Sequence, residues 1–476
     1  MTAELIVLGG AEDIGANCTY IGLDGTGIII DAGLHPRDRG QHAFPALASL
    51  GERSADVLVI SHAHNDHLGG LPFVMRAMPH LRPLMTHATR DLTHVMLHNT
   101  GRLLKSDITA WFPTESLSYY NREQIELLRH AFEAVPYDDP IRLKGWHGRH
   151  DVTMTLHWSG HILGAASVML ECNGLSILHT TDIQFDDQAL IGKAAVPRHH
   201  VDVLITEATN CGHDTPNDRV GETKRLGKFI ADVTNENGSV LIPSFALGKT
   251  QEILRILYGL MRSGSIPSIP IYTGGMGERI NKIYDQYCYT EPFRQPGFEV
   301  SDIPQERVDM NALFSNDFMS KPSIVVAQSG MVNKGTLSHA LARVWMRNPA
   351  FGIAFIGYQD PDTPGWSLSM SEPGVPFMFG TREMTRSCKV ERFRFSAHAS
   401  KEGLVDFIGD VRPGTLCITH GSPDACDALA LAVKERLPKT RILIPSLGRR
   451  YTVGRQTDGQ GASAHSHQQD PSDGVG

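Results

Sequence analysis

Short apolar runs rich in β-branched residues alternate with amphipathic helical patterns along most of the chain, which predicts an α/β fold. In the first half, the runs that predict buried strands are Ile28–Ile30, Val57–Ile60, Ile177–Leu178 and Val203–Ile205. Each run is followed directly by a polar residue. Because functional side chains in layered α/β folds gather beyond the carboxyl ends of strands, this pattern favours a site at that edge.

A second α/β unit is predicted after residue 210. Its expected elements are a helix over Gly221–Val233, a strand over Val240–Ile242, a helix over Lys249–Met261, a strand over Ser323–Ala327 and a helix over Gly335–Met346. The strand–helix pattern resumes from residue 390, with Arg392–Phe395, Lys401–Ile408, Thr415–Thr419 and Asp427–Leu437. Residues 456–476 contain almost no apolar residues and are predicted to be disordered.

The composition indicates a globular protein with more than one domain, because the chain has 476 residues of which 41% are hydrophobic and 20% charged. The N-terminal ten residues resemble a strand rather than a signal peptide, and no apolar run is long enough to span a bilayer. The seven cysteines are scattered without a Cys-x-x-Cys pair, which indicates reduced thiols. We therefore expect a cytoplasmic protein that does not enter a membrane.

The formal net charge of −8 argues against wholesale coating of nucleic acid, since non-specific binders are usually basic. An enzyme that binds a few phosphates in one cleft does not need a basic average, because local charge and metal ions can serve instead. The charge of the whole chain therefore leaves the partner open.

The residues that favour a particular chemistry are concentrated in the segment Ser61–Gly70, directly after a predicted strand. Four potential ligands fall within six positions there: His62, His64, Asp66 and His67. Imidazole and carboxylate groups suit zinc and similar divalent ions, and the absence of thiols argues against an iron–sulfur site. Four ordered ligands favour a metal site over a histidine-rich surface loop. One such loop can serve two metals, since alternate histidines point the same way on extended backbone.

Further candidate ligands follow other predicted strands or lie in glycine-containing turns: Asp31, His161, Asp182 and His420. Asp182 is expected to close a strand over Ile177–Asp182 and could bridge two ions, and Asp31 could orient a ligand from behind. A lone strand-end His or Asp is more often structural. The joint occurrence of these residues favours a two-metal centre. By contrast, His94 and His98, spaced i, i+4 on a predicted helix, could bind a metal, but a half-exposed helical face is the favoured interpretation.

Together these motifs resemble the metallo-β-lactamase superfamily and, within it, the β-CASP nucleases. The resemblance covers about residues 4–450, and about half of the chain separates Asp182 from His420, which leaves room for an inserted domain. Three segments resemble the β-CASP motifs: Thr206–Thr209, Phe395–Ser400 and Ile418–Gly421. The segment Ile242–Leu254 resembles a helix entry of the family, and Ser329–Met331 resembles one of its strand-end turns.

The chain departs from the family pattern in two places. Asn210 and Cys211 stand where Tyr and Gly are usual in the first motif, and Lys249 stands where the helix entry usually has Arg. A lysine keeps the positive charge but loses the bidentate geometry of a guanidinium. Neither departure removes a candidate metal ligand.

The resemblance implies an α/β fold made of a metallo-β-lactamase αββα sandwich with an inserted α/β β-CASP domain. The implied division is 1–208 for the first part of the metallo-β-lactamase domain, 209–389 for the β-CASP domain, 390–455 for the second part of the metallo-β-lactamase domain and 456–476 for a disordered tail.

The resemblance also implies a two-metal ribonuclease that hydrolyses single-stranded RNA with two zinc ions, although the same ligands admit manganese. The ligands of one ion would be His62, His64 and His161, and those of the other Asp66, His67 and His420, with Asp182 bridging and Asp31 behind them. Asp66 would accept the proton of the attacking water, His398 would protonate the leaving oxygen, and Glu207 would orient His398. The residues expected to contact RNA are Ser396, Lys249 and Ser329.

Two other functions stay open at this point: a small-molecule ester or thioester hydrolase on the same core, and a non-catalytic subunit of an RNA-processing complex. The insert with His398 and Glu207 counts against the first, because ester hydrolysis on this core needs neither. The retained ligands count against the second. His420, where the DNA-repair branch usually has Val, favours RNA-processing relatives. The sequence leaves open internal or 5′-terminal cleavage, the RNA target, cleavage of DNA and formation of a homodimer.

Overall fold

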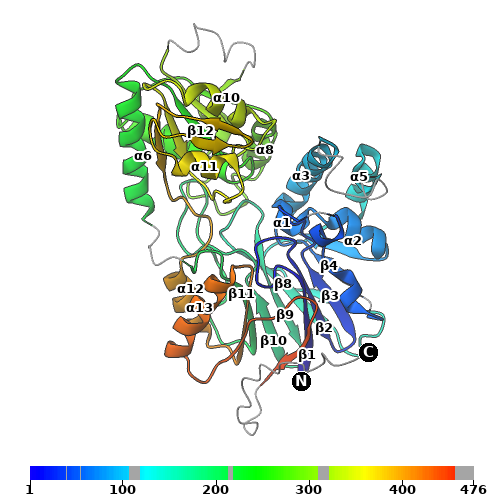
Figure 1. Cartoon of the computed structure of the whole chain (residues 1–476). Coiled ribbons are helices and arrows are strands. Elements are labelled where there is room, and N and C mark those ends of the chain that lie inside the picture. The colour runs from blue at the N-terminus through cyan, green and yellow to red at the C-terminus, as the bar shows by residue number, and fades with distance from the viewer. Residues whose placement is uncertain (39, 54, 107–117, 213–217, 309–320, 456–476) are drawn as a thin grey trace, which may run out of the picture.

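The computed structural model describes residues 1–38, 40–53, 55–106, 118–212, 218–308 and 321–455. The tail expected at 456–476 lies outside the described residues. Figure 1 shows two units, a lower sandwich of two sheets and an upper unit coloured green to yellow that interrupts it in sequence. No described helix is long and apolar enough to cross a membrane.

The first sheet of the sandwich contains seven strands. In spatial order they are β22 (Arg450–Gly454), β1 (Thr2–Gly9), β2 (Cys18–Leu23), β3 (Thr26–Ile30), β4 (Val57–Val59), β5 (Arg82–Met85) and β6 (Glu133–Ala134). Strands β1 to β3 are antiparallel, and β3 to β6 run parallel to one another. Because β22 pairs with β1, the last described strand closes the sheet that the first strand begins.

The second sheet of the sandwich also contains seven strands. In spatial order they are β21 (Arg441–Leu443), β20 (Thr415–Thr419), β11 (Val203–Glu207), β10 (Leu175–His179), β9 (Ala166–Cys172), β8 (Val152–Trp158) and β7 (Ile141–Leu143). Strand β11 precedes the upper unit in the sequence and β20 follows it, yet the two pair in parallel with Glu207 opposite Thr419. This pairing joins the part of the sandwich that precedes the upper unit in the sequence to the part that follows it.

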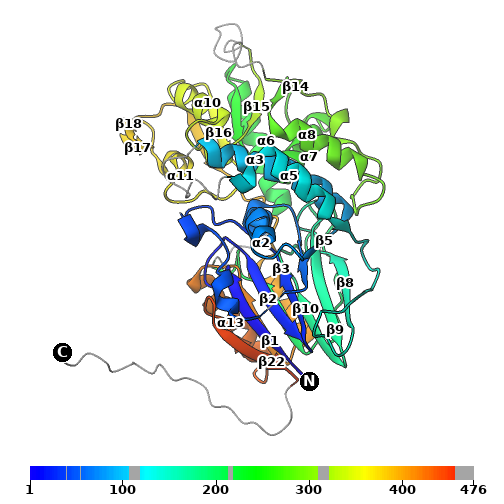
Figure 2. The same cartoon turned by 90° about the vertical axis from the view of Figure 1, so that its right-hand side faces the viewer.

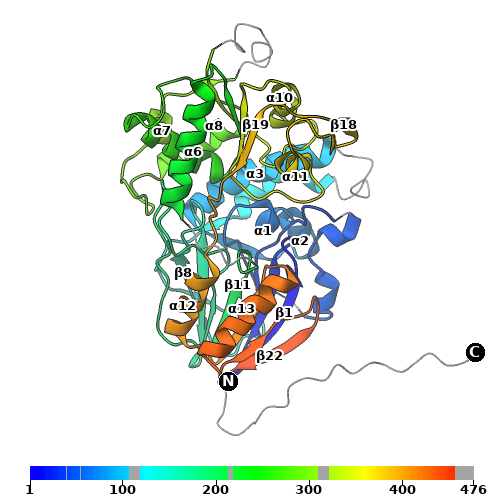
Figure 3. The same cartoon turned by 60° about the vertical axis from the view of Figure 1, so that its left-hand side comes forward.

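Both faces of each sheet are buried, which explains why the strands are continuous apolar runs. Ile28 and Ile30 of β3 face the other sheet, in one core with Val203 and Ile205 of β11, whereas Ile29 faces outward into a helix-covered core. The helices on the outer side of the first sheet are α1 (Asn65–Leu68), α2 (Leu71–Ala77), α3 (His87–Ser106) and α5 (Arg122–Leu128). Those outside the second are α12 (Lys401–Val411) and α13 (Pro423–Arg436), seen in Figure 3. The layers therefore form the expected αββα sandwich.

The upper unit is built on a six-stranded sheet in which every neighbouring pair is parallel. In spatial order its strands are β14 (Glu306–Arg307), β13 (Ile271–Thr273), β15 (Ile324–Ala327), β12 (Val240–Pro243), β16 (Gly352–Phe355) and β19 (Lys389–Arg392). Its helices are α6 (Arg219–Thr234), α7 (Lys249–Arg262), α8 (Met276–Gln286), α10 (Leu337–Trp345) and α11 (Pro364–Met370). A hairpin of β17 (Phe377–Phe379) and β18 (Arg382–Met384) lies beside α11.

Helices cover both faces of this inserted sheet, as an all-parallel sheet requires. On one face Val240 and Ile242 pack in a core with residues of α6 and α7. On the other face Leu241 packs in a core with Trp345 of α10. The remaining described elements are short 3₁₀ turns: η1 (Gly40–Ala43), η2 (Leu47–Leu50), η3 (Ser118–Tyr120), η4 (Arg129–Ala131) and η5 (Val300–Asp302).

Two sequence predictions about strand ends were wrong. The strand expected over Arg392–Phe395 lies earlier, at Lys389–Arg392, and the following residues form the connection back to the sandwich. The alternating apolar residues Phe393 and Phe395 are buried in that connection, where Phe393 packs on Phe229 with ring centroids 5.7 Å apart. The strand expected to end at Asp182 ends at His179, because Thr181 adopts a left-handed conformation with φ of 53°.

One close approach of backbones holds the site edge of the sandwich together. A Cβ atom on Gly33 would lie 1.8 Å from the Asp66 carbonyl oxygen and 2.4 Å from the Asn17 nitrogen. We expect Gly33→Ala to push these segments apart and to lower the free energy of unfolding by about 1–3 kcal/mol in urea titrations. The control is Gly259→Ala in α7, where the nearest atom would be 3.8 Å away. That change should raise stability by about 0.5–1 kcal/mol. An unchanged unfolding midpoint for Gly33→Ala would contradict the close approach.

Candidate metal centre

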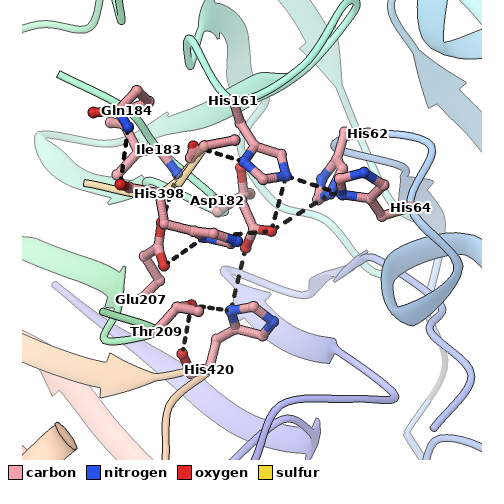
Figure 4. Close-up of polar contacts among 12 residues, drawn as sticks. His62, His64, His161, Asp182, Ile183, Gln184, Glu207, Thr209, His398 and His420 are labelled. Carbon is pink, nitrogen blue, oxygen red and sulfur yellow. Dashed lines mark hydrogen bonds and ion pairs between the residues drawn. The ribbon is translucent and has the colours of Figure 1, made fainter. Parts of the chain in front are cut away.

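The predicted ligands and the residues His398 and Glu207 converge at one edge of the sandwich, and Figure 4 shows several of them around Asp182. They come from loops and strand ends that are far apart in the sequence. His62 and His64 follow β4, Asp66 and His67 lie in α1, His161 lies between β8 and β9, Asp182 follows β10, Glu207 ends β11, His398 lies between β19 and α12, and His420 follows β20. The carboxyl ends of the strands thus bring together every ligand expected from the sequence.

The first group of potential ligands consists of three imidazoles and one carboxylate oxygen. His64 Nδ1 lies 3.2 Å from His62 Nε2 and 3.0 Å from His161 Nε2. Asp182 Oδ2 lies 3.5 Å from His62 Nε2 and 3.4 Å from His161 Nε2. All four ligand atoms therefore face one common point, as the ligands of a tetrahedral metal do.

The second group lies on the other side of the same carboxylate. Asp66 Oδ2 is 3.5 Å from His67 Nε2 and 3.4 Å from His420 Nε2. Asp182 Oδ1 is 3.4 Å from His67 Nε2, and among the described residues this buried oxygen accepts no hydrogen bond. A buried carboxylate oxygen without a donor is costly unless a cation satisfies it. The two oxygens of Asp182 thus face one ligand group each, which fits a carboxylate shared by two metal ions.

Hydrogen bonds to the Nδ1 atoms fix the orientation of two of the ligand rings, those of His67 and His161. His67 Nδ1 donates to Asp31 Oδ2 over 2.7 Å, and Asp31 also accepts from the Ser61 amide and hydroxyl. His161 Nδ1 donates to the Ala397 carbonyl oxygen over 2.9 Å. In both rings the proton is held on Nδ1, so the Nε2 atom is the one that can face a metal.

Burial and the surrounding charges set the protonation states. Burial holds the pKa of His62 and His161 well below the usual range, so both rings are neutral and offer lone pairs. Burial would raise the pKa of Asp182, but His420 and His67 outweigh it and hold that pKa well below its usual value. The neutral rings of His62 and His161 are therefore ready to bind a divalent ion. Burial would lower the pKa of His67, but the Asp182 and Asp66 carboxylates outweigh it and raise that pKa well above the usual value, so His67 has to release a proton when an ion binds.

A histidine–glutamate pair lies beside the ligands, with Glu207 buried and His398 20% exposed. His398 Nδ1 is 2.9 Å from Glu207 Oε2 and 3.9 Å from Asp182 Oδ2. Glu207 is held in turn by the Ile183 amide, which donates to Oε1 over 2.9 Å. Burial alone would lower the pKa of His398, but the Glu207 and Asp182 carboxylates raise it to about 9. His398 is therefore charged at neutral pH, and it lies beside the carboxylate that both ligand groups share.

The loop that carries His398 is held by side chains that the sequence reasoning missed. Gln184 Nε2 donates to the Ser396 carbonyl oxygen (3.2 Å) and to the His398 carbonyl oxygen (2.9 Å). Asn210 Nδ2 donates to Ser396 Oγ (2.7 Å) and to the His398 carbonyl oxygen (3.0 Å). Arg219 donates to the Ser396 carbonyl oxygen as well. The only signal in the sequence was position, since Gln184 and Asn210 directly follow predicted functional segments.

The three residues expected to contact RNA lie in different surroundings. Ser396 is half-buried in the His398 loop, and its hydroxyl oxygen accepts hydrogen bonds from Asn210 and the His398 amide. The Lys249 amine donates to the Phe395 carbonyl oxygen, and burial together with Arg219 lowers its pKa to about 7. Ser329 follows β15 in the inserted unit, where its Oγ accepts from the Met331 amide. Their contacts with RNA stay predictions.

Three family models match the chain in succession. The metallo-β-lactamase superfamily model matches residues 11–210, the β-CASP domain model residues 250–368, and a model described as a zinc-dependent metallo-hydrolase RNA specificity domain residues 383–445. The two-sheet sandwich and its strand-end ligands define a protein of the metallo-β-lactamase superfamily. Within that superfamily, the chain belongs to the β-CASP family. The matched models describe metallo-hydrolases, which act with divalent metal ions.

Curated relatives match most of the chain. It is 29% identical to endoribonuclease YSH1 of Candida glabrata over 440 residues, which cover 90% of this chain and 56% of that protein. It is 28% identical to cleavage and polyadenylation specificity factor 73 of Drosophila melanogaster, over 90% of this chain and 61% of that protein. The chain therefore spans less than two thirds of the length of these relatives.

A solved structure shares the fold. A protein of unknown function from Enterococcus faecalis matches with a TM-score of 0.57 and 12% identity, over 95% of this chain and 100% of that one. At this identity the likeness shows the architecture alone.

The hydrogen bond from His67 to Asp31 predicts a measurable effect on metal affinity. We expect Asp31→Asn to weaken zinc binding about 10- to 100-fold, because the amide no longer fixes the ring and its proton. Competition with a chromogenic chelator measures this change. Asp138→Asn is the control, since Asp138 also contacts a histidine (His157, 2.5 Å) but its side chain is 68% exposed and belongs to neither ligand group. Equal affinity in Asp31→Asn and the parent chain would contradict the role of Asp31.

Proposed function

We propose that the chain is a metal-dependent ribonuclease that hydrolyses phosphodiester bonds of single-stranded RNA in RNA processing or decay. The observation that carries the proposal is the His398–Glu207 pair, which lies 3.9 Å from the carboxylate shared by the two ligand groups. A charged histidine beside a metal centre suits a reaction whose leaving oxygen has to be protonated. Relatives that are named endoribonucleases, and a matched domain described by RNA specificity, support the choice of RNA.

We propose two zinc ions, with manganese as the alternative, because histidine and carboxylate ligands suit both metals. The residues that would hold one ion are His62, His64 and His161, and those for the other are Asp66, His67 and His420. Asp182 would give one oxygen to each. When bound, divalent ions offset the growing negative charge of the phosphate and make water a better nucleophile at neutral pH.

Two protein groups would handle the protons. Burial would raise the pKa of Asp66, but His67 and His420 outweigh burial and hold it below its usual value, so Asp66 is ionised. In this proposal Asp66 accepts the proton of the attacking water. His398 donates a proton to the leaving oxygen, and Glu207 keeps the imidazole charged and directed into the centre.

The contacts with RNA can be proposed in the same way. Ser396 lies two residues before His398 and carries a hydroxyl in the same loop, so it would contact a phosphate next to His398. Ser329 lies beyond the carboxyl end of β15, the edge at which parallel sheets bind ligands. Lys249 would contribute a positive charge to this region, while its amine holds the Phe395 carbonyl oxygen.

Two rival functions make different use of these residues. A small-molecule ester or thioester hydrolase on this core would leave His398 and Glu207 without a role, although the two are bonded to each other and Glu207 is buried. A non-catalytic subunit would have no use for ligand atoms that still face common points in both groups. Both observations favour the nuclease.

We further propose that the protein works in a reducing compartment such as the cytoplasm. All seven cysteines are free and buried, and burial raises the pKa of the Cys417 and Cys426 thiols to about 12. Buried thiols of this kind are inert and need no disulfide partner. Formation of a homodimer stays a prediction from the sequence.

Cleavage of labelled RNA tests the nuclease. We expect His398→Ala to slow cleavage of a single-stranded RNA by about 10²- to 10⁴-fold, because the leaving oxygen loses its proton donor. The metal content of that variant should be unchanged, whereas Asp182→Ala should lose both metal and activity. His200→Ala, a change at the exposed surface, is the control. Using 5′-labelled and 3′-labelled RNA separates internal from terminal cleavage. Bound metal with hydrolysis of a thioester or lactone and none of RNA would overturn the proposal.

The side-chain amide of Asn210 provides a second test. It donates hydrogen bonds to Ser396 and to the His398 carbonyl oxygen, and neither bond involves a ligand of the two groups. We expect Asn210→Ala to reduce the rate of RNA cleavage by about 10²-fold, because a small displacement of a proton donor misaligns it. Zinc content and the midpoint of unfolding should stay near those of the parent chain. Asn99→Ala, which removes a surface amide bonded to Arg102, is the control. A fully active Asn210→Ala chain would show that the loop keeps its position without this amide.

A further inference from the structure

A second cluster of potential ligands lies outside the metal centre, on two helices of the sandwich unit. His94 and His98 are one turn apart on α3, and Glu126 reaches them from α5. The two helices lie side by side, as Figures 1 and 2 show, and α3 also contacts α8 of the inserted unit. The sequence predicted only the i, i+4 pair of histidines. Glu126 comes close to them because α5 packs beside α3.

The three side chains bring one ligand atom each to a common point. His98 Nε2 lies 3.2 Å from His94 Nε2 and 3.1 Å from Glu126 Oε1, and His94 Nε2 lies 3.2 Å from Glu126 Oε2. A tetrahedral zinc ion with bonds of about 2.0–2.1 Å holds its ligand atoms about 3.3 Å apart. The spacing in this cluster is therefore close to that of an occupied zinc site.

Hydrogen bonding alone accounts poorly for this arrangement. A neutral imidazole carries one N–H, so two facing Nε2 atoms are attracted only when one donates and the other accepts. Here each Nε2 also faces its own oxygen of Glu126, so if both rings donate to that carboxylate, two N–H donors lie 3.2 Å apart without an attraction between them. A metal ion removes the conflict, because both nitrogens then present lone pairs to it and the carboxylate supplies charge.

The metal centre of the same chain gives a template for the ring geometry. Its liganding pairs His62–His161 and His64–His161 have centroids 4.8 and 4.9 Å apart and ring planes at 77° and 81°. The pair His94–His98 has centroids 4.7 Å apart and ring planes at 88°. The nitrogen spacing is also alike, 3.2 Å here and 3.0 and 3.2 Å in the centre. The surface pair thus repeats the mutual position of rings that face a metal.

The cluster is accessible to ions from solution. The side chains of His94 and His98 are 26% exposed and that of Glu126 is 43% exposed. An exposed ion pair of this kind contributes little to stability by itself. Three protein ligands on an open surface leave a fourth position for water, which is the usual coordination of an accessible zinc site.

We propose that His94, His98 and Glu126 bind a zinc ion that joins α3 to α5. Such an ion links two helices that are separated in sequence by residues 107–121. It also acts close to the contact between the two units, because Asp91 on α3 accepts a hydrogen bond from Tyr287 of the inserted unit over 2.8 Å. The ion therefore fixes α5 to the helix on which the inserted unit rests.

Zinc content and position test this site. The full chain is loaded with stoichiometric zinc chloride, passed through a desalting column and analysed for metal. We expect the His94→Ala, His98→Ala double variant to retain about one zinc ion fewer than the parent chain, since two ligands of three are lost. The rate of RNA cleavage should stay that of the parent, which separates this site from the metal centre. The control is His157→Ala, because His157 is a half-buried histidine that contacts a single carboxylate, Asp138.

A gentler variant keeps the test decisive if the double variant folds poorly. Glu126→Gln preserves size and hydrogen bonding but removes the negative ligand. Zinc should raise the midpoint of thermal unfolding in the parent chain, and we expect that rise to shrink in Glu126→Gln. Anomalous diffraction at the zinc edge should show a peak between α3 and α5 in the parent alone. Equal zinc content in the parent and the double variant, or no anomalous peak at these side chains, would overturn the proposal.

Discussion

The buried carboxylate of Asp182 is the group on which the arrangement of the rest of the site depends. Its side chain is 2% exposed, and its two oxygens lie 3.4 Å from His161 Nε2 on one side and 3.4 Å from His67 Nε2 on the other. An ionised carboxylate at this depth is stable only when positive charge or donors surround it. Histidines from the strand-end loops of both sheets surround Asp182 and provide this stabilisation. They form two ligand groups that share the one carboxylate.

The inserted unit contributes none of the described ligands of the centre, yet it helps to position His398. His398 lies on the segment by which the chain returns from β19 to α12, and the carbonyl oxygens of that segment are held from both sides. Gln184 holds it from the sandwich, and Lys249 holds it from the insert. A displacement of one unit against the other would therefore move the imidazole relative to Asp182.

The grouping of the candidate ligands at one edge could be predicted from the sequence, because it depends on residue type and order. His62, His64, Asp66 and His67 fall within one short segment after a strand, and the αββα layers follow from apolar runs. The residues that hold the His398 loop could not be predicted, because Gln184, Asn210 and Arg219 bond to backbone carbonyls of a distant segment and leave no spacing to detect. The prediction of a strand at Arg392–Phe395 was wrong for a related reason. Phe393 lies in a loop and packs on Phe229, and this burial gives the same alternation of apolar residues as a strand.

The parallel pairing of β11 with β20 also determines when the centre can form during synthesis. The first ligand group lies entirely before the insert, whereas His398 and His420 lie after it. Because a nascent chain folds from its N-terminus, a ribosome-bound chain that ends within the insert has the first ligand group but lacks His398 and His420. On its second side Asp182 then has His67 but not His420. The order of the chain thus delays completion of the second ligand group until translation has passed residue 420.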